Sequence, residues 1–145
     1  MLRFSVTQFE AIVTHCQSRY PKEACGVLAG NGQPPVGAAG DVVAVYPMTN
    51  VEDSPIGYAL DPKEQLHVEK QMRAQKQKLL GIYHSHTASE AYPSPVDVRL
   101  AISPEISYVL VSLKNREKPV LKSYRIESEQ IIPEDAVIED GLAAE

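Results

Sequence analysis

The chain has few cysteines, no long apolar run and no excess of positive charge. Its two cysteines, Cys16 and Cys25, could pair in an oxidising compartment, but nothing else in the sequence indicates export, so we expect buried free thiols. The first ten residues, MLRFSVTQFE, interrupt their apolar side chains with polar ones, which excludes a signal peptide and a membrane span there. We therefore expect a cytoplasmic protein without a membrane partner.

The negative charge is concentrated at one end. The net charge is −5, and the last dozen residues hold five acids and no base, so the rest of the chain carries 14 acidic and 14 basic residues. A balanced body lacks the basic stripe that binding to a phosphate backbone requires, which excludes nucleic acid as an expected partner. The acids in question are Glu134, Asp135, Glu139, Asp140 and Glu145.

Length and composition are those of an ordinary globular protein. With 145 residues, 43% of them apolar and 23% charged, the chain is long enough to bury one core and contains no repeat. We expect one domain over residues 1–133, followed by an acidic tail over 134–145 that is partly flexible.

Capping signals and hydrophobic periodicity predict three helices. Ser5 with Gln8 fits a capping box, and Asp61, Pro62 and Glu64 fit the N-cap, N1 and N3 positions of a second helix. The third helix repeats this logic from Ser94 onward. The expected helices span residues 5–19, 61–77 and 94–101.

Short apolar segments bounded by turn residues predict strands between and after these helices. Loops are expected at 31–40 and 49–57, where Gly, Pro and other turn formers gather. Alternation of helices and strands, with a run of strands at the end, indicates an α/β fold with a mixed central sheet flanked by helices. The expected strands span residues 24–29, 42–46, 58–60, 79–84, 107–113 and 120–126, with a short piece near Ile131.

Two histidines and one carboxylate are expected to converge. Side chains alternate along a strand, so His84 and His86 point the same way, and residues three apart on a helix share a face, so Ser94 and Asp97 project together. A loop of seven residues joins the two pairs. Two imidazoles and a carboxylate leave one tetrahedral position of a zinc ion open, as in a catalytic site.

A proton acceptor is needed beside such an ion, and Glu23 is the candidate. It is the one acid next to a strongly predicted buried strand and far from the tail, and partial burial would raise the pKa of its carboxyl toward the range of a general base. Ser94 could donate a hydrogen bond to the oxyanion that forms when an amide carbonyl is attacked.

Each of these residues also has a simpler interpretation. A lone H-x-H occurs on many surface strands, and Glu23 could merely cap or pair at a strand edge. Ser94 and Asp97 are explained by helix initiation, which is worth about 1 kcal/mol without a metal. The case for chemistry depends on the five residues together.

Together the five residues resemble the motif of a known family. Glu23 followed by His84, His86, Ser94 and Asp97 reproduces the pattern Glu, then H-x-H-x7-S-x-x-D, of the JAMM (MPN-plus) metalloproteases. The resemblance implies a cytidine-deaminase-like α/β fold and a zinc isopeptidase. It also implies that His84, His86 and Asp97 hold one catalytic Zn²⁺, that Glu23 is the base and that Ser94 assists the oxyanion.

The segments EACGVLAG, PMTN, YHSHTASEAYPS and YVLVS are similar to a bacterial branch of that family, the CysO-cysteine peptidases. This implies hydrolysis of the amide after the C-terminal Gly-Gly of a ubiquitin-like sulfur-carrier protein, with release of cysteine for cysteine biosynthesis. The alternatives are an isopeptidase acting on other ubiquitin-like conjugates or peptides, and a non-catalytic scaffold domain of the same fold. Thr87 departs from the wider family, where proline often follows the second histidine.

The remaining candidate residues receive structural or minor assignments. His15 and His67 lie on predicted helices without a partner acid, and Cys25 is expected to pack in the core. The basic residues Arg73, Lys76 and Lys78 could meet an acidic carrier but are typical of a solvated helix face. The loops at 47–60 and 87–93 are the expected walls of the site.

Overall fold

The computed structural model describes residues 1–31 and 40–139. Most of the loop expected at 31–40 and the last part of the acidic tail, 140–145, lie outside the described residues. The helices are α1 (Val6–Arg19), α2 (Pro62–Ala74) and α3 (Pro95–Arg99). The strands are β1 (Leu2–Ser5), β2 (Cys25–Asn31), β3 (Gly40–Asp41), β4 (Ala44–Met48), β5 (Gln77–His86), β6 (Ser107–Ser112), β7 (Val120–Glu127), β8 (Gln130–Glu134) and β9 (Ala136–Glu139).

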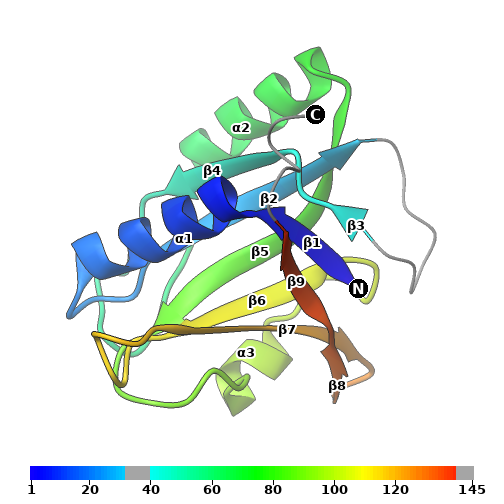
Figure 1. Cartoon of the computed structure of the whole chain (residues 1–145). Coiled ribbons are helices and arrows are strands. Elements are labelled where there is room, and N and C mark those ends of the chain that lie inside the picture. Colours follow the sequence, from blue (N-terminus) through cyan, green and yellow to red (C-terminus); the bar gives the residue numbers. More distant parts are fainter. Residues whose placement is uncertain (32–39, 140–145) are drawn as a thin grey trace.

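A six-stranded sheet in the order β4-β2-β5-β6-β7-β8 forms the centre of the fold (Figure 1). Only β5 and β6 run parallel in this sheet, and its other neighbouring strands are antiparallel. A second sheet has the order β3-β1-β9 and is parallel. The expected α/β class with a mixed sheet flanked by helices is confirmed.

The two faces of the large sheet pack against different helices. On one face, Ile12 and Cys16 of α1 join a core cluster with Tyr83 of β5 and with residues of β1, β2 and β6. On the other face, Val68 and Met72 of α2 pack against β2 and β4, while residues of α3 pack near Ile82 of β5. Since strand side chains alternate, the residues that follow Ile82 at even numbers lie on the face of α2 and α3.

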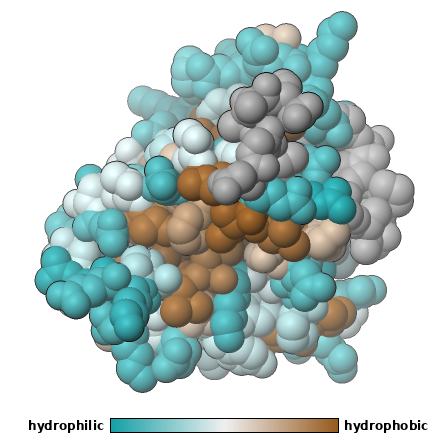
Figure 2. Space-filling model, viewed as in Figure 1, coloured by the Kyte–Doolittle hydropathy of each residue, from teal (hydrophilic) through white to brown (hydrophobic). Residues whose placement is uncertain are grey.

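The surface that faces the viewer in Figure 1, on the α1 side of the large sheet, carries an apolar area. Figure 2 shows apolar residues gathered in the middle of this view, between α1 and β7. Within the described residues, no helix combines the length and the apolar character that crossing a membrane would require.

The first helix begins as predicted. Ser5 accepts a hydrogen bond from the Gln8 amide at 3.0 Å, and the Gln8 side chain accepts one from the Ser5 amide at 2.9 Å, which completes a capping box. Cys16 and Cys25 are both free and buried, as expected.

The first strand pairs with the last strand that the structure describes, which the sequence did not indicate. Residues 136–139, expected to belong to a partly flexible tail, form β9, which pairs in parallel with β1 over Leu2–Ser5. The Leu2 amide also donates to the Asp135 carbonyl at 2.8 Å. These backbone bonds between distant segments hold the chain in place as far as Glu139, and the domain boundary at 133 stays a prediction.

Three smaller expectations were wrong. The strand expected at 42–46 runs over Ala44–Met48 and includes Pro47, because β4 lies at the sheet edge, where a missing N–H is tolerated. Residues 58–60 form no strand but one isolated bridge, Asn50 to Leu60. Helix α2 ends at Ala74 instead of Gln77.

Candidate metal centre

The strand β5 carries both histidines to its end. His84 and His86 are buried, and their Nε2 atoms lie 3.2 Å apart, so the two rings point at the same place. Ser85, between them, turns the other way and accepts a hydrogen bond from the Ala24 amide at 2.8 Å. The alternation predicted from the sequence is therefore present, and β5 extends to His86 rather than ending at His84.

The start of α3 brings the carboxylate to the histidines. Ser94 is the N-cap and accepts a hydrogen bond from the Asp97 amide at 3.1 Å, while Asp97 Oδ2 accepts one from the Ser94 amide at 2.8 Å. Asp97 Oδ1 lies 3.2 Å from His84 Nε2, and Oδ2 lies 3.1 Å from His86 Nε2. The capping box thus aims the carboxylate between the two rings.

The spacing of these three groups fits a metal ion. Ligand atoms around a tetrahedral zinc ion, with bonds of about 2.0–2.1 Å, are about 3.3 Å from each other. His84 and His86 Nε2 are 3.2 Å apart, and each lies 3.1–3.2 Å from a different oxygen of Asp97. One ligand atom from each residue lies within 4.8 Å of the others, so the carboxylate can offer either oxygen to the ion. His86 Nδ1 lies 3.0 Å from the Glu90 carbonyl, so donation from that nitrogen would leave Nε2 unprotonated for a metal.

Burial and hydrogen bonding set the charges within this group. Burial disfavours ionisation of Asp97, but hydrogen bonds with His84 and His86 outweigh it and lower the pKa of its carboxyl. Burial lowers the pKa of His84, which keeps that ring neutral. Burial opposes protonation of His86 as well, yet its hydrogen bonds with Asp97 and Glu90 raise its pKa. An ionised carboxylate beside a neutral imidazole is the form in which both bind a cation.

Glu23 lies just before β2, next to the end of β5. Its neighbour Cys25 pairs with His84, and the Ser85 amide donates to the Ala24 carbonyl at 3.0 Å, which puts Glu23 at the His86 side of the group. Glu23 is only 6% exposed. Burial raises the pKa of its carboxyl to about 7, against the attraction of His86. A carboxyl that titrates near neutrality can take up and return a proton.

Asn50 holds the backbone around Glu23 and had no role in the sequence interpretation. Its buried side-chain amide donates to the Glu23 carbonyl at 3.0 Å and to the Gly57 carbonyl at 2.9 Å. Its Oδ1 accepts from the amides of Glu52 and Ala59, both at 3.0 Å. The PMTN segment contains this residue, but nothing in its composition shows that one side chain closes the loop.

Tyr58 is a second residue that the sequence interpretation missed. Its ring stacks on His84 with the centroids 4.4 Å apart and an angle of 25° between the planes. This contact covers one face of the imidazole and forms part of the wall expected from the loop at 47–60. The sequence showed only a short predicted strand at 58–60 after a loop, and neither feature marks Tyr58 as a partner of His84.

Thr87 joins the two loops that were expected to form the walls. It is buried, and its hydroxyl donates to the Pro55 carbonyl at 3.2 Å. A proline at this position could not make that bond, so the departure from the wider family fastens the loop after His86 to the loop at 47–60.

The other candidates are not part of the ligand group, although Cys25 pairs with His84 across β2 and β5. The His15 ring contacts the Tyr83 hydroxyl at 2.6 Å, and His67 is exposed on α2. Burial raises the pKa of the Cys25 thiol to about 12, which disfavours the thiolate that a metal would need. The basic residues Arg73, Lys76 and Lys78 are exposed, and their contact with a carrier stays a prediction.

Comparison with known proteins adds an independent finding. A family model described as prokaryotic homologs of the JAB domain matches residues 5–127. The chain is 48% identical over 116 residues to the CysO-cysteine peptidase of Mycobacterium tuberculosis, covering 80% of this chain and 76% of that protein. It is 35% identical over 97 residues to the desampylase of Haloferax volcanii, covering 66% of each.

A solved structure is also similar over almost the whole chain. The solution structure of a Desulfitobacterium hafniense protein superposes with a TM-score of 0.85 at 37% identity, covering 97% of this chain and 94% of that one.

Proposed function

This chain belongs to the prokaryotic homologs of the JAB domain, and we propose that it is a zinc-dependent peptidase acting on a ubiquitin-like sulfur-carrier protein. The bond hydrolysed is the amide after the carrier's C-terminal Gly-Gly, and cysteine is the released amine. The observation that carries the proposal is the convergence of His84, His86 and Asp97 within 4.8 Å of one another beside a buried glutamate. Similarity to a CysO-cysteine peptidase supports this choice of substrate.

Each of the five motif residues has a separate role in the proposed hydrolysis. His84, His86 and Asp97 would hold one zinc ion, which when bound acts as a Lewis acid that makes water more acidic and polarises an amide carbonyl. Glu23 accepts the proton of the attacking water and returns it to the leaving nitrogen. The Ser94 hydroxyl uses a lone pair for the Asp97 amide, so its hydrogen can point to the oxygen of the carbonyl under attack.

The acyl part of the substrate is an extended carrier tail. We place this tail beside a strand edge near the site, where main-chain hydrogen bonds hold it as an added strand. The loops at 47–60 and 87–93, joined by the Thr87 contact with Pro55, form the walls around it. We propose that the protein acts in the cytoplasm.

The test is a Glu23→Gln variant assayed for zinc and for turnover. Glutamine keeps the shape of the side chain but cannot accept the proton, so the variant should bind one equivalent of zinc and lose hydrolysis of a carrier-cysteine adduct. Removal of a general base costs roughly 10²- to 10⁴-fold. Undiminished turnover would remove Glu23 as the base, and absence of bound zinc in the wild type would favour a scaffold domain instead.

A second candidate keeps the site and changes the leaving group. The similarity to a desampylase favours hydrolysis of a conjugate in which the amine belongs to another protein. Comparing the carrier-cysteine adduct with a carrier joined to a protein lysine distinguishes the two, because the preferred leaving group should be cleaved with the higher kcat/KM.

A further inference from the structure

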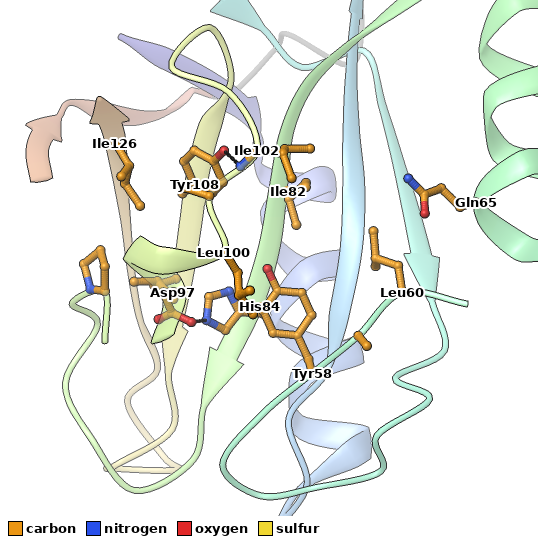
Figure 3. A pocket seen from close by; sticks show the side chains of 14 residues that line it. Tyr58, Leu60, Gln65, Ile82, His84, Asp97, Leu100, Ile102, Tyr108 and Ile126 are labelled. Carbon is orange, nitrogen blue, oxygen red and sulfur yellow. Dashed lines mark hydrogen bonds and ion pairs between the residues drawn. The ribbon is translucent and has the colours of Figure 1, made fainter. Parts of the chain in front are cut away.

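A pocket of about 270 Å³ lies next to His84 and Asp97, on the side of α3 (Figure 3). The ring of Tyr108 faces it, but the Tyr108 hydroxyl is used elsewhere: it accepts from the Ile102 amide at 2.8 Å and donates to the Ser103 carbonyl at 3.0 Å. The described residues that line the pocket include no lysine or arginine, so the pocket offers no permanently charged side chain to an anion. Its apolar walls are Tyr58, Leu60, Ile82, Leu100, Tyr108 and Ile126.

The pocket and Glu23 lie on opposite sides of the ligand group. Ile82, His84 and His86 follow each other on one face of β5, and the pocket is lined by the first two. Glu23 lies at the His86 end, because Cys25 pairs with His84 and Ala24 bonds with Ser85. Ile82 and His86 are four positions apart on the strand, which is about 13 Å.

This arrangement determines in which orientation the substrate crosses the ligand group. A base that returns its proton to the leaving nitrogen must lie within hydrogen-bond reach of that nitrogen, so the amine half of the substrate lies on the Glu23 side. The acyl half must then extend past His84 toward Ile82. The pocket is therefore on the path of the acyl half.

We propose that this pocket binds an apolar side chain of the acyl half and so determines which tail is cleaved. The inference rests on the proposed function. Two glycines before the scissile bond carry no side chain and span about 7 Å when extended. The distance from His84 to Ile82, two strand residues, is also about 7 Å. The first side chain upstream of Gly-Gly therefore lies beside Ile82, at the pocket.

The chemistry of the walls predicts the preference. A volume of about 270 Å³ accommodates a side chain such as leucine or methionine, whose burial between Tyr58 and Ile126 is favourable. An aspartate in the same place would lose its water without gaining a lysine or arginine as a partner. We expect the kcat/KM for leucine to exceed that for aspartate by roughly 10- to 200-fold.

Hydrolysis of a peptide series is the first arm of the test. The probes are acetylated peptides ending in X-Gly-Gly-Cys, where X is leucine, alanine or aspartate, given to the zinc-loaded protein. The Leu100→Glu variant should raise KM for the leucine peptide at least tenfold, because this exposed residue lines the pocket. Val96→Glu is the matched control, since Val96 is exposed one turn earlier and does not line the pocket.

Binding without turnover is the second arm. Methyl NMR of isoleucine-labelled protein is recorded while acetyl-Leu-Gly-Gly, the product tail, is added. The methyl signals of Ile82, Ile102 and Ile126 should shift, and that of Ile132, which lies away from the pocket, should not. If those signals shift but no peptide is hydrolysed, the pocket stands and the proposed reaction fails. Hydrolysis at equal rates for all three peptides, or no shift at these methyl groups, would overturn the pocket assignment.

Discussion

Replacing Glu23 with glutamine should change how the stability of the metal-free protein depends on pH. The Glu23 carboxyl is 6% exposed, and burial raises its pKa from 4.5 to about 7. The unfolded chain therefore loses this proton at lower pH than the folded protein does. Between pH 4.5 and 7 the folded state binds more protons, so the free energy of unfolding falls as the pH rises.

The size of the effect follows from the two pKa values. Raising a pKa from 4.5 to about 7 corresponds to about 3 kcal/mol of unfolding free energy, lost in full once the pH is well above 7. Glutamine has no proton to lose, so the unfolding free energy of the Glu23→Gln variant does not fall in this way as the pH rises. Relative to the wild type, the variant should gain about 3 kcal/mol between pH 4.5 and pH 8.

The assay is urea unfolding in the presence of a chelator at pH values from 4.5 to 8. Circular dichroism is the suitable signal, because the chain contains no tryptophan. Glu10→Gln, which changes an exposed acid of α1, is the matched control and should follow the wild type. Parallel pH curves for wild type and Glu23→Gln would refute the conclusion that Glu23 is a buried carboxyl with a raised pKa.

Three further changes test the site and the fold around it. Asp97→Asn replaces one charged oxygen with an amide group, so zinc affinity measured by chelator competition should fall more than tenfold; unchanged affinity would exclude Asp97 as a ligand. Asn50→Asp keeps both accepted hydrogen bonds but loses the donor to the Glu23 carbonyl, and kcat should fall by roughly tenfold with zinc content unchanged. Gly81→Ala places a Cβ 2.7 Å from the Ser107 carbonyl oxygen, and thermal unfolding should show a loss of about 2 kcal/mol or more.

The two halves of the site could be predicted because each depends on a local sequence pattern. Features that depend on pairing between distant segments could not be predicted in this way. The H-x-H alternation and the cap at Ser94 each depend on a few consecutive residues, so spacing alone predicts which side chains share a face. The position of Glu23 depends on the register in which Cys25 pairs with His84, and the family motif was needed to select it.

Other features had no local signal. Strand β1 overlaps the segment that also caps α1, and its parallel partner β9 is more than 130 residues away in the chain. Asn50 lies in a segment of turn formers, where a side chain that organises a loop resembles one that faces water, and Tyr58 follows that segment in a strand that does not form. Their roles arise only from tertiary contacts with Glu23 and His84.

The two interpretations of Ser94 and Asp97, helix initiation and metal binding, are compatible in this geometry. A carboxylate has two oxygens, each able to accept more than one bond. Asp97 Oδ2 serves the Ser94 amide and faces His86, while Oδ1 faces His84. The cap, worth about 1 kcal/mol, therefore holds the carboxylate in the position that a metal requires before any metal binds. With Ser94 kept and asparagine in place of Asp97, the helix would still begin here, but an amide nitrogen would then face one of the imidazoles. Among common capping pairs, a carboxylate at the third helical position is the one that satisfies both demands.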